Sequence, residues 1–170
     1  MIELRRLSVD DGMDVYVMLQ EISKEENGLM NNANGLSFEE YKDWLKRKYA
    51  DSEQIGLKDG WKVPSTTYWL YADERPVGFG SIRHFLTDAL REAGGHIGYG
   101  IAPKYRGKGY GKKILELLLE EASCLGIDRV LVTIQLDNAA SKAVAFANGG
   151  VIGKQTDERI FVWIDTVRKC

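Results

Sequence analysis

The residues with the clearest capacity for chemistry lie between positions 104 and 113, in the run Lys-Tyr-Arg-Gly-Lys-Gly-Tyr-Gly-Lys-Lys. Five of these ten side chains are cationic, three are glycine and none is acidic. A helix N-terminus carries unpaired N–H groups and a partial positive charge, and alternate glycines let a phosphate approach the main chain. Gly107, Gly109 and Gly111 therefore predict a phosphate cradle made mostly of backbone donors, with a solvated basic turn as the alternative.

Two common phosphate-binding motifs do not match this run. A P-loop places four residues between its first glycine and a Gly-Lys-Ser/Thr triplet, but here Gly107 and Gly111 are too close and Lys113 replaces the hydroxyl. The dinucleotide fingerprint Gly-x-Gly-x-x-Gly is not formed either, because the third glycine comes one residue early. The cradle must therefore belong to another class of phosphate-binding site.

The flanking sequence predicts an α/β domain with a mixed sheet in which seven strands alternate with about four helices. We expect strands at 2–7, 66–72, 77–85, 96–101, 129–135, 151–154 and 160–167. We expect a first helix that ends near residue 27 and a second helix that starts after a capping box at Ser37. Two further helices are expected at 112–125 and 138–147. A helical turn is expected at 87–93 and a loop at 51–65. The cradle then lies between the fourth strand and the helix that follows it.

Two glycines interrupt the strand expected at 96–101. Gly98 and Gly100 stand where a regular strand would carry side chains. Interior glycines in a strand mark a bulge or a close approach of a ligand to the backbone. We therefore expect either a bulge in this strand or a ligand that lies close to its backbone.

Composition limits the class of protein. The chain has 170 residues, which suits one domain over 1–170, and its 23 basic and 25 acidic side chains argue against a general binder of nucleic acids or anionic membranes. No apolar run approaches the about 18 residues that would span a bilayer. The two cysteines are too few for a disulfide framework and have no neighbours at metal-ligand spacing. We therefore expect a cytoplasmic protein with no metal.

The run from Arg106 to Gly111 resembles the Arg/Gln-x-x-Gly-x-Gly/Ala signature of the GNAT superfamily of acyl-CoA-dependent N-acyltransferases. It follows Ile101-Ala102-Pro103, as is usual in that superfamily. Asp137-Asn138, Ser141 and Gly149-Gly150 resemble its segment from the fifth strand to the fourth helix, and the element order fits along the whole chain. The resemblance implies a mostly antiparallel seven-stranded sheet flanked by about four helices, with a bulged, splayed fourth strand.

The resemblance also implies acetyl-CoA, or another short acyl-CoA, as acyl donor. Its pantetheine arm would lie along the fourth strand and its pyrophosphate on the cradle, and two residues of the following strand–helix segment would face it. The residues implied are Gly100, Ile101, Ala102, Arg106, Gly107, Lys108, Gly109, Tyr110, Gly111, Lys112, Asn138 and Ser141. For the last two, a helix N-cap and small-residue packing are the alternatives.

Acyl transfer to an amine needs a neutral amine, stabilisation of the developing oxyanion and a proton for the leaving thiolate. We expect the backbone N–H of Ile101 to stabilise the oxyanion. His96 stands where the superfamily often has a glutamate base, and an imidazole suits that task. The alternative is a strand histidine or a substrate contact. Many members of the superfamily have a tyrosine that protonates the leaving thiolate, and the corresponding position here is Ala145. Either another residue such as Tyr99 acts as this general acid, or the thiolate leaves unaided. The neighbouring Phe146 is expected in the core.

The function implied is an N-acetyltransferase that moves an acetyl group to a primary amine by direct attack in a ternary complex. The alternative is a non-catalytic acyl-CoA-binding regulatory module. The acceptor, a small molecule or a peptide, would be selected by residues 28–49 and 155–160. A homodimer is common in the superfamily. Acidic side chains could attract a cationic amine, or merely form a solvated face: Glu25, Glu26, Glu39 and Glu40.

Overall fold

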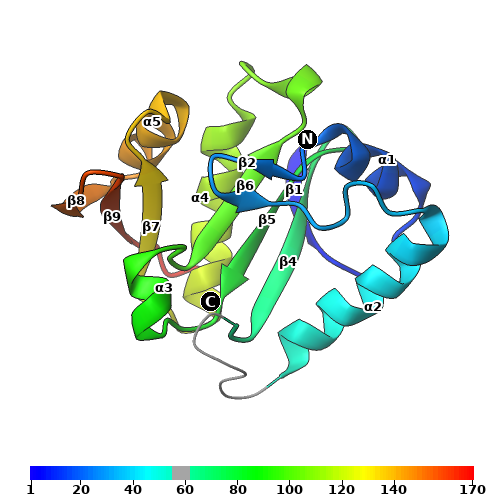
Figure 1. The fold of residues 1–170 in the computed structure, drawn as a ribbon, viewed down its shortest axis with the longest axis horizontal. Helices are drawn as coiled ribbons and strands as arrows, with labels where there is room; N and C mark the ends of the chain where they lie inside the picture. Colours follow the sequence, from blue (N-terminus) through cyan, green and yellow to red (C-terminus); the bar gives the residue numbers. More distant parts are fainter. Residues whose placement is uncertain (55–61) are drawn as a thin grey trace.

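The structure is a computed structural model that describes residues 1–54 and 62–170. These residues form nine strands and five α-helices (Figure 1). The strands are β1 (Ile2–Arg6), β2 (Glu25–Glu26), β3 (Leu29–Met30), β4 (Ser65–Ala72), β5 (Arg75–Arg83), β6 (Ile97–Ile101), β7 (Arg129–Gln135), β8 (Val151–Gln155) and β9 (Arg159–Asp165). The helices are α1 (Met13–Glu21), α2 (Phe38–Glu53), α3 (Asp88–Glu92), α4 (Tyr110–Cys124) and α5 (Ala139–Ala147), with a 3-10 turn η1 (Pro103–Tyr105).

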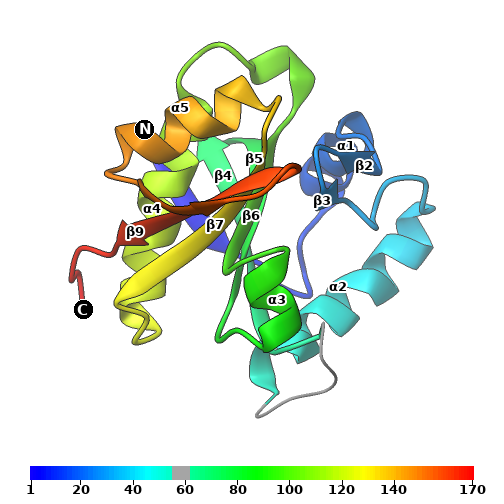
Figure 2. The same ribbon diagram turned by 60° about the vertical axis from the view of Figure 1, so that its left-hand side comes forward.

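The seven expected strands are present but do not form one sheet. In the described part of the chain, β1, β4, β5 and β6 make a four-stranded antiparallel sheet, and β7, β9 and β8 make a separate antiparallel sheet. The three-stranded sheet lies beside the β6 edge of the larger one (Figure 2). The expected single sheet is therefore corrected to two sheets that separate between β6 and β7.

Helices cover both faces of the four-stranded sheet. On one face, α4 buries Ile114, Leu115 and Leu118 against the apolar side chains of β4, β5 and β6. On the other face, α1 and α2 pack on the aromatic residues of β4 and β5 (Figure 1). The capping box of α2 is confirmed, because the Ser37 hydroxyl accepts from the Glu40 N–H while the Glu40 carboxylate accepts from the Ser37 N–H.

The first helix is shorter than the sequence predicts. It ends at Glu21 rather than near residue 27, and the residues beyond it turn back as the β2–β3 hairpin. Asn31 provides the physical reason, because its buried Nδ2 donates to the carbonyl oxygens of Leu19 and Ile22 at 2.8 and 2.9 Å. These bonds satisfy acceptors at the helix end that further turns would otherwise use.

Two other expectations need comment. The loop expected at 51–65 is shortened at its start because α2 continues to Glu53, and its residues 55–61 lie outside the described residues. Phe146, expected in the core, is 45% exposed on α5. Ala145 takes the buried position instead, since the inward stripe of this short helix passes through it.

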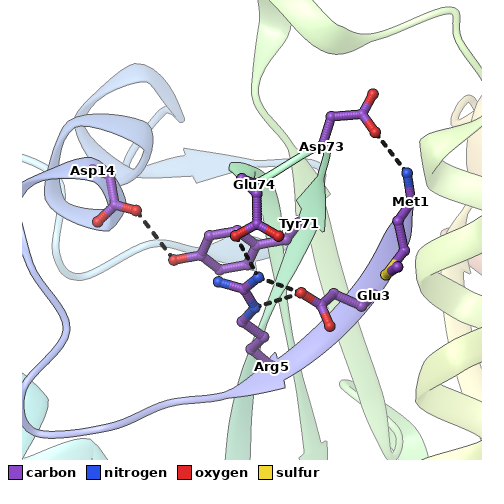
Figure 3. A network of polar contacts seen from close by, with 7 residues as sticks. All are labelled: Met1, Glu3, Arg5, Asp14, Tyr71, Asp73 and Glu74. Atoms are coloured by element: carbon purple, nitrogen blue, oxygen red, sulfur yellow. Dashed lines mark hydrogen bonds and ion pairs between the residues drawn. The ribbon is translucent and has the colours of Figure 1, made fainter.

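A polar network ties β1 to the β4–β5 turn and to α1 (Figure 3). The Arg5 guanidinium lies 3.9 Å from the ring centre of Tyr71 and bonds the carboxylates of Glu3 and Glu74. The Tyr71 hydroxyl donates to Asp14 at 3.2 Å. Exposed ion pairs contribute little to stability, so the backbone ladder with β4 is what mainly holds this edge strand.

No helix in the described part of the chain is long and apolar enough to cross a membrane. The same residues contain no group of three or more His, Cys, Asp or Glu arranged to hold a metal ion.

A single disulfide joins Cys124, the last residue of α4, to Cys170. The bridge spans 46 positions of sequence and encloses β7, α5, β8 and β9. The two cysteines are too few for a disulfide framework, as expected. They do form one disulfide, which the sequence analysis did not predict.

Reduction of this disulfide is expected to destabilise the protein. Closing a loop of this length in the unfolded chain is worth about 4 kcal/mol in the chain-entropy model. Denaturant unfolding with and without a reductant measures the difference. The Cys124→Ser/Cys170→Ser double variant serves as the control, because it should show the lower stability in both conditions. A wild-type unfolding curve that is unchanged by the reductant would contradict the presence of the disulfide.

Candidate active site

Backbone hydrogen bonding connects the two sheets at His96 and Leu131. His96 donates its backbone N–H to the Leu131 carbonyl oxygen at 2.8 Å, and the Leu131 N–H donates to His96 Nδ1 at 2.9 Å. From this junction β6 and β7 both run on, but each is hydrogen-bonded within its own sheet (Figure 2). The junction is therefore the closed end of a gap between the sheets.

The edges of this gap carry backbone groups that no neighbouring strand uses. Ala102 donates to Val77 and Arg83 donates to His96 at the two ends of the β5–β6 pair. Because hydrogen-bonded and non-bonded pairs alternate along antiparallel strands, the amides of Ile97, Tyr99 and Ile101 point away from β5 and toward β7. The same alternation along β7 turns the backbone of residues 133 and 135 toward the gap.

A cavity of about 710 Å³ occupies this gap and continues across the sheet to α2. Both diverging strands line it, together with η1, the start of α4 and the start of α5. It brings together most of the predicted site residues, namely Gly100, Ile101, Arg106, Gly107, Gly109, Tyr110, Gly111, Lys112, Asn138 and Ser141. Three predicted residues do not line it: Ala102 is fully buried beside Val77, Lys108 is exposed, and His96 is buried at the junction itself.

The predicted phosphate cradle forms an open loop at the start of α4. Gly107 and Gly109 have φ values of 77° and 85°, and a β-carbon on either would meet no atom within 4 Å. The first backbone bond of the helix is donated by Lys113 to Gly109 at 3.2 Å. Among the described residues, the N–H groups of positions 107–112 have no backbone acceptor, so six backbone donors at this helix N-terminus are left for a ligand or solvent.

The Arg106 side chain does not lie in this cradle. Its Nε donates to the Ile101 carbonyl oxygen at 3.0 Å, and its two terminal nitrogens donate to the Glu26 carboxylate at 3.0 and 2.9 Å. A bidentate pair of this kind fixes both partners in orientation. Arg106 therefore ties the end of β6 to the β2–β3 hairpin, while its backbone begins the cradle.

The glycines of β6 have a different explanation from the one the sequence suggested. The β5–β6 register runs without a shift from Ile82–Ile97 to Gly78–Ile101, so β6 contains no bulge. Leu29 of the hairpin lies over Gly98 and Gly100, and a β-carbon at Gly100 would come within 2.7 Å of its Cδ2. The glycines make room for this leucine, and the separation of the sheets arises at the His96–Leu131 junction.

Asn138, Ser141 and Tyr99 form a polar chain on the far wall of the cavity. The Asn138 amide donates to the Ser141 hydroxyl at 3.0 Å, and its oxygen accepts from the Ser141 N–H at 3.2 Å, which caps α5. The Tyr99 hydroxyl hydrogen-bonds with Ser141, and burial raises the pKa of Tyr99. The N-cap interpretation of Asn138 is therefore confirmed, and the same residue also lines the cavity.

His96 is 8% exposed and uses Nδ1 as an acceptor, which makes it a neutral imidazole at the junction. Burial, followed by the charges of Arg91 and Arg83, lowers the pKa of His96 to about 4. A base with this pKa is unprotonated at neutral pH, but the structure gives it a backbone partner and a place outside the cavity wall.

The end of the cavity beneath α2 includes residues within the expected range 28–49 and others that sequence reasoning missed. Lys48 and Trp44 of α2 and Arg83 of β5 line it, together with hydroxyl side chains of β4, β5 and β7. A signal for part of this wall was present, since Ser65 and Thr67 stand at alternate positions of a strand otherwise rich in apolar residues. The Arg83 side chain could not be assigned to this wall in the same way, because its place there depends on how β4 and β5 pair.

The sheet is split, and the edge of β6 leads into a glycine-rich helix N-terminus. This arrangement is typical of acyltransferases with a GNAT-like fold. The family model for the acetyltransferase (GNAT) domain matches residues 2–151, and the chain belongs to this family. The resemblance drawn from the sequence is thereby confirmed.

Solved structures of acetyltransferases share the fold. RimL, a ribosomal L7/L12 alpha-N-protein acetyltransferase in complex with coenzyme A, superposes with a TM-score of 0.70 at 16% identity, over 97% of this chain and 94% of that chain. MccE, a microcin C7 self-immunity acetyltransferase in complex with acetyl-CoA and AMP, gives 0.68 at 14%, over 96% and 92%. Campylobacter jejuni PseH with acetyl coenzyme A gives 0.64 at 12%, over 98% and 100%. No curated protein sequence matches the chain.

The titration of His96 is expected to appear in the stability of the protein. Its folded pKa of about 4 lies below the ordinary value of 6.5, so the contribution to stability is complete above pH 6.5 and decreases as the pH falls toward 4. The shift corresponds to about 3 kcal/mol. Unfolding free energies measured between pH 7 and 4 test this.

The His96→Asn variant is the matched control, because an amide oxygen can accept from Leu131 but does not titrate in this range. The difference between the wild-type and variant curves isolates His96 from the carboxylates. Parallel curves would mean that His96 titrates equally in the folded and unfolded chains.

Proposed function

We propose that the protein transfers an acetyl group from acetyl-CoA to an amine by direct attack within a ternary complex. The observation that carries this proposal is the continuous path from the free edges of β6 and β7 to the unpaired amides of residues 107–112. A pantetheine arm has the amide groups to bond such edges, and a pyrophosphate has the charge to suit such a helix end. The coenzyme A and acetyl-CoA in the related RimL, MccE and PseH structures support the choice of donor.

The cradle fits a pyrophosphate because its donors come from the main chain. Gly107 and Gly109 keep β-carbons out of the loop, and Lys112 lines the same wall. Charge-assisted bonds from several N–H groups to phosphate oxygens are each stronger than neutral ones. We assign the binding of the phosphates to the backbone N–H groups of residues 107–112, with the Lys112 side chain adding charge.

Bound acetyl-CoA would supply a thioester carbon that an amine can attack. On the protein side, the Ile101 N–H faces the gap and is our candidate donor to the negative charge that develops on the acyl oxygen. Asn138 and Ser141 lie on the opposite wall and are placed to bond the pantetheine arm. Holding donor and amine in one cavity supplies much of the rate by itself.

Tyr99 is our candidate proton donor to the leaving thiolate. It extends from β6 toward α5, the helix on which the superfamily often carries its tyrosine, and bonds Ser141 there. Its raised pKa keeps the phenol protonated at neutral pH. The buried Ala145 leaves no tyrosine on α5 to compete for this role.

For His96 we propose a positioning role in place of the base role suggested by the sequence. Its bonds to Leu131 set where β6 and β7 separate, and its side chain is not in the cavity wall. The acceptor amine would then enter in its neutral form or lose its proton to water.

Replacing Gly109 is expected to abolish tight binding of coenzyme A. A valine at φ 85° is strained, so the loop must change its backbone and turn its amides out of the cradle. Losing even one charge-assisted bond weakens binding by at least about tenfold. Calorimetry on Gly109→Val measures this.

Gly126→Val is the matched control, because Gly126 has a φ of 82° and equally open space but follows the other end of α4. It should bear similar backbone strain and bind coenzyme A normally. Equal affinity for coenzyme A in both variants would remove the cradle from the proposal.

Tyr99→Phe is expected to lower kcat about 100-fold without changing the KM for acetyl-CoA, the lower range for loss of a general acid. Free thiol release from acetyl-CoA over a panel of amines measures the rate. Tyr68→Phe is the control, since Tyr68 is a core tyrosine of neighbouring β4 that does not line the cavity. An unchanged kcat would mean that the thiolate leaves unaided. A protein that binds acetyl-CoA but releases no thiol with any amine would be the regulatory module.

A further inference from the structure

The cavity changes from apolar to polar where the four-stranded sheet passes beneath α2. Trp69 and Phe79, which pair across β4 and β5, are buried aromatic residues. Two and four positions further from this pair, the same face of the two strands carries polar side chains that line the cavity. These are Ser65, Thr67, Ser81 and Arg83.

Two cationic side chains meet at this polar end. Arg83 comes from β5 and donates to the Gly95 carbonyl oxygen at 2.9 Å, while Lys48 comes from α2, with its Nζ 5.9 Å from the ring centre of Trp44. Within residues 1–54 and 62–170, neither cation forms an ion pair with a carboxylate. Three hydroxyls and two cations therefore line this part of the wall.

The charged groups around Lys48 are mostly positive. Burial alone lowers the pKa of the Arg83 guanidinium. Burial also lowers the pKa of Lys48, and the charges of Lys62, Arg83 and Arg47 act in the same direction against the carboxylate of Asp51. Cations removed from water are costly unless a negative group accompanies them. A ligand that brings such a group would remove this cost.

This end of the cavity is distinct from the phosphate cradle. Arg83 bonds His96 at the closed end of the gap, whereas the cradle follows Ile101 at the other end of β6. Five residues of strand separate the two ends by about 13 Å at about 3.3 Å per residue. The anion that the cradle would bind therefore does not also neutralise Arg83.

We infer that the acceptor is a small amine that also carries an oxyanion, a carboxylate or a phosphate, bound by Arg83 and Lys48. This inference rests on the proposed function and names its acceptor class. The planar guanidinium suits two-point contact with such an oxyanion, and the neighbouring hydroxyls supply further donors. It replaces the expected attraction of a cationic amine by acidic residues, because Glu26 is paired with Arg106 and Glu40 caps α2.

The test compares amines that differ only in the anionic group. β-Alanine is paired with β-alaninamide, and O-phosphoethanolamine with ethanolamine, and longer ω-amino acids are paired with their amides to sample the distance between amine and anion. Wild type is expected to show a kcat/KM at least about tenfold higher for one anionic series, as a charge-assisted contact implies. The carboxylate and phosphate pairs distinguish the two sources of the oxyanion.

Arg83→Gln and Lys48→Gln are expected to lose about 10- to 100-fold in kcat/KM for the anionic amines, with the neutral amines changed little. Lys46→Gln is the matched control, since Lys46 is an exposed cation on the same helix and pairs with Asp43. Arg83→Lys keeps the charge and a donor for Gly95, so it should retain part of the preference. If Arg83→Gln does not fold, Lys48→Gln and Arg83→Lys decide the outcome.

Calorimetry with acetyl-CoA separates this inference from the proposed function. If wild type binds acetyl-CoA but shows no preference within any matched pair, the anionic acceptor is wrong and the proposed function stands. If acetyl-CoA does not bind, the proposed function fails, and direct binding of N-acetyl-β-alanine against its amide decides the anion site. Equal affinities for N-acetyl-β-alanine and its amide would overturn the anion site.

Discussion

The junction between His96 and Leu131 is the constraint on which the rest of the site depends. A backbone bond and a side-chain bond connect the two sheets there, and from that point on β6 and β7 do not pair with each other in the described part of the chain. Unpaired strand edges inside a protein are costly unless something else bonds them. The junction therefore creates a slot whose backbone groups suit an extended ligand with amide groups.

Local patterns in the sequence were sufficient for most elements and for the cradle. The capping box at Ser37 and the glycines after Ile101 act through contacts within a few residues, so their spacing alone predicts their structure. The division of the sheet was harder, because it depends on residues 96 and 131, which are distant in sequence. The bulge was wrong for the same reason, since Leu29, which requires Gly98 and Gly100, comes from a distant hairpin.

The acceptor end of the cavity was the part that the sequence could least predict. Arg83 is an ordinary strand-end arginine until the β4–β5 register places it beside Ser65 and the packing of α2 brings Lys48 over the same face. Of the four glutamates that seemed suited to an amine, Glu25, Glu26 and Glu40 have other hydrogen-bond partners in the folded chain. Charge pattern along a chain says little about charge in a cavity, because long-range packing decides which side chains face it.

The pairing of Arg106 with Glu26 bears on our proposal that one cavity binds two anions. Because its guanidinium is neutralised by a carboxylate of the hairpin, the signature arginine contributes little net charge to the gap, and main-chain amides are left as the principal donors of the cradle. In the proposal, the cradle binds its anion through short-range amide contacts with added charge from Lys112, whereas the charges of Arg83 and Lys48 lie at the closed end of the gap. An acceptor with a negative group would therefore be drawn to the closed end of the gap and leave the cradle to the donor.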